Sequence, residues 1–173
     1  MMELLALGSR GGSNLLVLFS DSSLELCDEL FLAALQWGTS RYTKTHYIRR
    51  ERLTRIPTVP SEYFIDPARL STIRFHYTDN YPLEKAASLS FDLHVRADDS
   101  LIIVETDQQC YLEEHAVANT LALLASFSCG KRRSIVTLPH DEDLVTTASL
   151  FSSNLYRVNK DHTLTDLLSS DKS

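Results

Sequence analysis

The chain has 173 residues, of which 43% are hydrophobic and 23% charged, a balance typical of a globular protein and sufficient for one domain with a buried core. No apolar run approaches the ~20 residues that cross a bilayer, and the first residues lack the basic start and cleavage site of a signal peptide. The three cysteines and six histidines have no metal-ligand spacing, which argues against a metal centre, and we interpret the cysteines as small buried thiols.

Positive charge is concentrated in one segment of an acidic chain. Residues 41–55 contain six lysines and arginines against one glutamate, a net charge of +5, which leaves −11 for the rest of a chain whose total is −6. Such a protein repels polyanions everywhere except at its basic segment. Any contact with nucleic acid is therefore expected there.

The amino-terminal half is predicted to begin with a strand, a turn and a helix. We expect residues 1–13 to form an edge strand or a flexible lead-in. A continuous apolar run predicts a strand buried on both faces at 14–19, and the serines and aspartate of 20–23 can cap the helix that follows. That helix ends at Gly38. Its apolar stripe consists of Leu26, Leu30, Ala34 and Trp37.

The remaining chain continues the alternation of strands and helices. A strand is predicted at 44–48, and Asp66 and Pro67 predict a short helix, as its cap and its first residue. Alternating side chains predict a strand at 73–77. Further strands are expected at 100–106, 133–139 and 155–158, with helical patterns at 82–99 and up to residue 127. The polar tail, residues 159–173, is expected to fray.

Strands separated by helical patterns indicate βαβ units. They predict an α/β fold with a mostly parallel sheet and helices on both faces. We expect a single core domain at residues 14–158. Ligands of such sheets bind beyond the carboxyl ends of the strands, so the turns that follow strands are the places to look for function.

The turn after the first strand has the position of a phosphate-binding loop without its chemistry. Such loops use glycines to approach the phosphates, a lysine to reach them and a hydroxyl to hold magnesium. Glu25 falls at the lysine position and Leu26 at the hydroxyl position. The degenerate turn consists of Ser20, Asp21, Ser22, Ser23, Glu25 and Leu26. A carboxylate repels phosphate and leucine binds no metal, so we expect no nucleotide cofactor and no catalysis by this chain alone.

A second position of interest is the end of the apolar strand at 101–105. Nucleotide-hydrolysing folds place there the acid that holds the magnesium shell, and this chain has Glu105. Because the first site is defective, we expect Glu105 to order the sheet edge or to contact a partner rather than to bind a metal.

The segment Ile65–Tyr77 is the most distinctive in the sequence. It resembles the SWIM-domain-associated subunit of the metazoan Shu complex, a small and divergent RecA-like recombinase paralogue. The family pattern D-P-x-R-L-x-x-I-R-F-x-Y is matched by Asp66, Pro67, Arg69, Leu70, Ile73, Arg74, Phe75 and Tyr77. Upstream, the positions that look like the family's paired arginines, leucine and proline are Arg49, Arg50, Leu53 and Pro57. The likeness spans roughly residues 14–125, with Glu105 where the family has aspartate; the departure is the turn, because family members can carry a full glycine-lysine turn.

The resemblance implies a RecA-like fold with a degenerate P-loop and a nuclear role in homologous recombination and DNA repair. Such subunits pair with a SWIM-type zinc-binding protein or with other recombinase paralogues. Together they help the main recombinase assemble on single-stranded DNA or stabilise its filament. Two alternatives stay open: an active small P-loop-type NTPase, and a scaffold subunit of an unrelated complex without DNA contact.

Four arginines are the candidates for DNA binding. Arg49, Arg50, Arg52 and Arg55 follow a strand and should reach the carboxyl edge of the sheet, where they could contact phosphates without sequence preference. The tyrosines near enough in sequence to offer stacking are Tyr42, Tyr47 and Tyr63. A solvated loop, or a contact to an acidic partner, explains the arginines equally well.

Other patterns have simpler interpretations. Residues 131–133 precede a strand and are expected in a solvated turn at the opposite edge of the sheet. Phe31–Ala34 matches the F-x-x-A pattern by which recombinases dock on one another, yet its place in an amphipathic helix favours core packing. Phe75 and Tyr77 are likewise expected in the core.

Overall fold

Strands and helices alternate along the chain in the computed structural model, which describes residues 4–7, 13–21, 25–38, 43–63, 65–94, 99–107, 109–110 and 112–169. The helices are η1 (Leu4–Ala6), α1 (Cys27–Trp37), α2 (Pro67–Leu70), α3 (Pro82–His94), α4 (Glu114–Phe127) and α5 (Glu142–Ser149). The strands are β1 (Leu15–Ser20), β2 (Lys44–Arg49), β3 (Ile73–Tyr77), β4 (Ser100–Val104), β5 (Arg133–Pro139), β6 (Asn154–Val158) and β7 (Leu164–Asp166).

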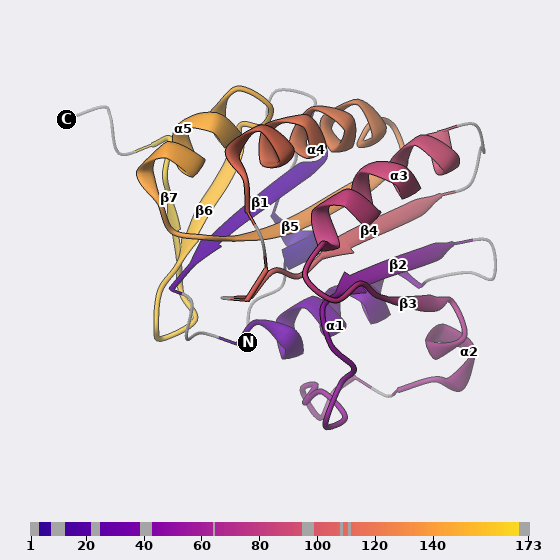
Figure 1. The fold of residues 1–173 in the computed structure, drawn as a ribbon. Coiled ribbons are helices and arrows are strands. Elements are labelled where there is room, and N and C mark those ends of the chain that lie inside the picture. The colour runs from indigo at the N-terminus through magenta and orange to yellow at the C-terminus, as the bar shows by residue number, and fades with distance from the viewer. Residues whose placement is uncertain are drawn as a thin grey trace.

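The described strands form one twisted sheet in the order β3-β2-β4-β5-β1-β6-β7 (Figure 1). Every neighbouring pair is parallel except β6 and β7, which are antiparallel. The strand β5 therefore lies between β1 and β4, and the carboxyl ends of all three open onto the same edge. The predicted α/β fold, a mostly parallel sheet with helices on both faces, is confirmed.

Two hydrophobic cores cover the two faces of this sheet. Helices α3, α4 and α5 pack on one face, and α1 and η1 pack on the other. Along β1, Val17 and Phe19 enter the first core while Leu16 and Leu18 enter the second. Because successive side chains of a strand point to opposite faces, only an unbroken apolar run can fill both cores, which is why β1 has no alternating pattern.

The helix ends follow the expected capping chemistry at some places only. Asp66 accepts a hydrogen bond from the Ala68 amide at 2.8 Å, and Asp141 accepts from the Asp143 and Leu144 amides. The expected cap of α1 by residues 20–23 is wrong: the cap residue is Leu26, with no side-chain hydrogen bond. Gly38 follows α1, where a Cβ would lie 2.8 Å from Thr72 Oγ1.

The amino-terminal segment is anchored to the second core. Residues 4–6 form η1, and the Leu4 side chain is buried. The Arg133 guanidinium donates hydrogen bonds to the carbonyl oxygens of Leu5 and Leu7. The expectation of an edge strand or flexible lead-in is therefore wrong for residues 4–7. So is the expectation that Arg133 lies in a solvated turn, because it is half-buried beneath this segment.

The carboxyl-terminal tail also belongs to the fold. β7 pairs with β6, and the turn between them brings His162 Nδ1 within 2.6 Å of Oε1 of Glu29 on α1. Glu29 is 4% exposed, and His162 has a positive φ of 60°. The expected fraying of the tail is wrong for residues 159–169, because these residues form a short hairpin with β6 that contacts the buried Glu29.

We predict that His162→Asn lowers the free energy of unfolding by about 2 kcal/mol, because Glu29 then loses its partner inside the protein. Asparagine tolerates the positive φ, so the change isolates the loss of the imidazole. Urea denaturation measures the effect. Lys160→Ala in the same hairpin is the control, and we expect it to leave the free energy of unfolding unchanged. Equal stability of the two variants would show that the hairpin does not depend on this contact.

Candidate functional site

A pocket of about 610 Å³ opens at the carboxyl ends of β1, β4 and β5. This is the edge at which parallel α/β sheets bind ligands. Both positions singled out in the sequence meet here: Ser20, Asp21, Glu25 and Leu26 line one side, and Glu105 lines the other. Ser22 and Ser23 of the degenerate turn lie outside the described residues.

The lining of the pocket is acidic. Among the described residues that line it are the carboxylates of Asp21, Glu25, Glu105 and Asp107 and one guanidinium, that of Arg50. Arg50 Nε is 2.7 Å from Asp107 Oδ2, so this cation is already engaged. Burial opposes ionisation of Asp107, but its hydrogen bonds, above all with Arg50, outweigh that effect and hold its pKa below the usual value. Each of these four carboxylates also lies within 4.0 Å of an arginine of this chain, so the described lining offers a phosphate no unengaged cation.

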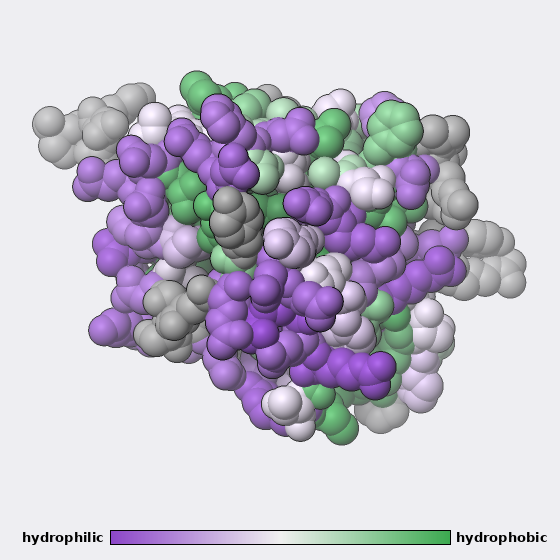
Figure 2. Space-filling model, viewed as in Figure 1, coloured by the Kyte–Doolittle hydropathy of each residue, from purple (hydrophilic) through white to green (hydrophobic). Residues whose placement is uncertain are grey.

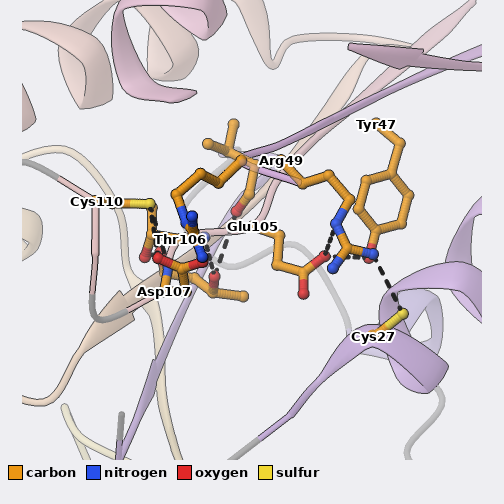
Figure 3. A network of polar contacts seen from close by, with 10 residues as sticks. Cys27, Tyr47, Arg49, Glu105, Thr106, Asp107 and Cys110 are labelled. Atoms are coloured by element: carbon orange, nitrogen blue, oxygen red, sulfur yellow. Dashed lines mark hydrogen bonds and ion pairs between the residues drawn. The ribbon is translucent and has the colours of Figure 1, made fainter. Parts of the chain in front are cut away.

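Glu105 is held by residues of the neighbouring strand β2 (Figure 3). The Tyr47 hydroxyl donates to Glu105 Oε2 at 2.7 Å, and Arg49 Nε lies 3.5 Å from the same oxygen. The parallel register of β2 and β4 pairs Ile48 with Val104, which places the three polar groups side by side where the strands end. Arg49 Nη1 also reaches the thiol sulfur of Cys27 on α1, at 3.7 Å.

The electrostatics of this group follow from its burial. Burial raises the pKa of Glu105, and the nearby Arg49 and the Tyr47 hydrogen bond offset part of that rise. Burial and the adjacent carboxylate also hold the pKa of Tyr47 well above its usual value, so its hydroxyl remains a donor. The expected role of Glu105 in ordering the sheet edge matches these contacts. In nucleotide-hydrolysing folds the acid at this position holds the magnesium shell, whereas Glu105 contacts a tyrosine and an arginine.

The candidate DNA-binding arginines do not form one free cationic surface. Arg55 Nη1 lies 2.7 Å from Asp28 Oδ1, and its other nitrogen 3.9 Å from Glu25. With Arg49 and Arg50 paired as above, three of the four arginines bind acids of this chain. Arg52 is different: it makes no ion pair with a described residue, and its guanidinium lies 5.8 Å from the centre of the Tyr77 ring.

The aromatic residues near the basic segment differ in accessibility. Tyr47 is completely buried, so the expectation that it could stack with a base is wrong. The Tyr63 hydroxyl accepts a hydrogen bond from Gln36, and Tyr42 lies outside the described residues. Tyr77 is 44% exposed, which corrects its expected place in the core, whereas Phe75 is partly buried against the second core.

The remaining sequence candidates have structural roles. Residues 31–34 are buried in the core, as expected. Cys27 and Cys110 are buried thiols, whereas Cys129 is exposed, contrary to expectation. Burial raises the pKa of Cys110 to about 11, which keeps it protonated at neutral pH. The described residues contain no cluster of three or more histidines, cysteines or acids placed to hold a metal ion, and no described helix is long and apolar enough to cross a membrane.

Sequence reasoning found the two strand ends but not the partners of the arginines. Asp28 and Asp107 belong to no recognisable sequence motif. Asp28 pairs with Arg55, and Asp107 with Arg50, only because the fold brings distant segments together. The one signal available was the excess of acids around the degenerate turn.

Comparison with known proteins identifies a shared fold and no family. No protein-family model and no curated protein matches the chain. Among solved structures, it is similar to one described as a unique ATP synthase subunit NeqB from Nanoarcheaum equitans, with a TM-score of 0.56 and 14% sequence identity. The match covers 87% of this chain and 46% of that chain, so this chain spans less than half of that protein's length. At this identity the likeness shows the α/β fold alone.

We predict that Arg49→Met lowers the free energy of unfolding by about 2 kcal/mol at neutral pH, because it leaves the buried Glu105 carboxylate without its cationic partner. Adding Glu105→Gln should recover part of the loss, since both charges are then removed. A double-mutant cycle in urea measures the coupling.

The pH dependence gives a second test of the same pair. The pKa of Glu105 is raised in the folded state, so the folded protein binds the proton more tightly than the unfolded chain. Stability from this group is then greatest below the unfolded pKa and declines as pH rises through the folded pKa. Arg49→Met should make that decline steeper, and Glu105→Gln should remove it. Identical pH profiles for all three proteins would contradict the pairing.

Proposed function

We propose that this chain is a non-catalytic recombinase-paralogue subunit that assists homologous recombination within a nuclear hetero-complex. In this role it supports assembly or stability of the recombinase filament on single-stranded DNA. The observation that carries the proposal is the acidic lining of the pocket, together with the resemblance of residues 65–77 to the SWIM-domain-associated subunit of the Shu complex.

The pocket supports a subunit without nucleotide chemistry. Phosphate binding needs backbone amides, a lysine and a bound magnesium ion. Here Glu25 stands at the lysine position, and the Glu105 carboxylate contacts Tyr47 and Arg49. The edge at which related folds bind nucleotide thus holds internal ion pairs in this chain. The chain would therefore act by binding partners at its surface.

The family-like segment lies on such a surface. Residues 67–70 form α2, and residues 73–77 form β3, which is one of the two end strands of the described sheet (Figure 1). Arg74 and Tyr77 of this segment are exposed, and Arg69 is partly exposed. Side chains of this kind contribute little to a core, which supports a role for them in binding a SWIM-type protein, another recombinase paralogue or the recombinase itself.

An active NTPase is the second candidate, favoured by the size of the pocket and by the fold shared with an ATP synthase subunit. It requires magnesium-dependent turnover by the purified chain that disappears in Glu105→Ala. If the chain is instead a scaffold subunit of an unrelated complex, that complex should make no contact with DNA through this chain.

Affinity purification from cells through this chain tests the proposed role. Co-purification of a SWIM-type protein or a recombinase is the expected result. Recovery of a stable complex that contains neither would contradict the proposal, whatever else it contained.

We predict that Arg52→Ala, in the complex purified through this chain, weakens binding to single-stranded DNA and lowers the salt slope of log K by about 1, the effect of losing one phosphate contact. Arg55→Ala is the matched control: its guanidinium is engaged by Asp28, so a smaller effect is expected. Fluorescence anisotropy at several salt concentrations measures both. If changing Arg49, Arg50, Arg52 and Arg55 together to alanine leaves DNA binding intact, this segment does not contact DNA.

A further inference from the structure

β3 is an end strand of the described sheet, with β2 as its neighbour on the inner side. In a parallel ladder, alternate residues of an outer strand bond to the inner neighbour and the others point away. The Thr45 amide bonds to the Thr72 carbonyl, and the Thr78 amide bonds to the Arg49 carbonyl, so the even-numbered residues of β3 face β2. The amides and carbonyls of Ile73, Phe75 and Tyr77 therefore point to the open side.

This edge is short and carries Arg74, but it lacks two other features that protect natural sheet edges, a proline and a bulge. Proteins commonly blunt an outer strand with a proline, a bulge or a covering segment. Residues 73–77 contain no proline, and their register with residues 45–49 runs unbroken without a bulge. Large hydrophobic side chains also remain accessible around the strand. Leu70, Tyr77 and Tyr81 are 39%, 44% and 50% exposed.

Both faces beside the edge carry positive charge. On the α3 side, the two charges that act on His76 are Lys85 and Arg74, and burial with these two cations lowers the pKa of His76. On the opposite side, Arg52 lies over the Tyr77 ring. None of these three cations makes an ion pair with a described acid, in contrast to the arginines around the pocket. In Figure 2, a hydrophobic stripe on the lower right of the view lies beside pale, weakly hydrophilic side chains in the region of α2.

We propose that the β3 edge binds an extended, acidic segment of a partner protein, which adds to the sheet as a further strand. Main-chain hydrogen bonds to Ile73, Phe75 and Tyr77 would supply affinity, as in other cases of strand addition. Carboxylates on the partner would contact Arg74 and Lys85 on the α3 side of the edge, whereas Arg52 lies on the other side, over the Tyr77 ring. A polypeptide strand matches this spacing of amides and carbonyls, whereas a nucleic-acid backbone does not. The inference rests on the strand edge and the charges beside it, and not on the recombination role.

The test uses the full chain and a labelled peptide of alternating valine and glutamate, eight residues long. Binding is measured by fluorescence anisotropy. Two control peptides have the same charge and carry N-methyl groups on one or the other alternate set of amides. Each of them can no longer form backbone hydrogen bonds along its methylated edge, while the protein is unchanged. We expect the unmodified peptide to bind and one methylated register to lose at least about tenfold in affinity, the effect of one or two hydrogen bonds.

Matched protein variants separate the main chain from the side chain. Tyr77→Pro removes a donor on the open side, whereas Tyr77→Ala removes the ring and keeps the donor, so only the proline variant should lose most of the binding. Arg74→Gln with Lys85→Gln should also weaken binding, and bound peptide should raise the pKa of His76 in NMR titration. Absence of peptide binding would overturn the proposal. So would equal effects of the two Tyr77 variants, preferential binding of a dT20 oligonucleotide at the same edge, or self-association of the chain that Tyr77→Pro abolishes.

Discussion

The Glu105 carboxylate is the group on which the carboxyl edge of this sheet depends. It directly follows the completely buried strand β4, and a carboxylate buried in that position needs partners inside the protein. Tyr47 and Arg49 provide them from the adjacent strand, and Arg49 extends the network to Cys27 on α1. The contacts thus join β2, β4 and the start of α1 at the place where this class of fold binds ligands.

The same logic applies to the acids at the start of α1. Negative side chains are favourable near a helix amino terminus, where the free amides carry partial positive charge. Asp28 also accepts hydrogen bonds from Arg55 and from the Thr58 amide, so the loop after β2 is fixed against the helix. The basic segment is therefore largely neutralised by the acids that stand in the degenerate turn and beside it. Arg52, Arg74 and Lys85, which make no ion pair with a described acid, lie instead around β3.

Local chemistry explains what could be predicted from the sequence. The strands at 73–77 and 133–139 have the predicted bounds, and the Asp66 cap forms as expected, because each depends on residues next to one another. The pairs Glu29–His162 and Arg55–Asp28 join residues far apart in the chain, so no local pattern announces them. For this reason the docked tail was missed, and the basic segment was predicted as a free surface when most of its arginines are engaged.

The most direct test of this account is the thermal unfolding of the purified chain in millimolar ATP with magnesium. If the ion pairs of the pocket have replaced nucleotide binding, the midpoint should be the same with ATP, with ATP and magnesium, and with buffer. A site filled to a hundred times its dissociation constant would stabilise the chain by about 2.7 kcal/mol, an effect that unfolding reports readily. A magnesium-dependent rise of the midpoint that Glu105→Gln abolishes would contradict the account.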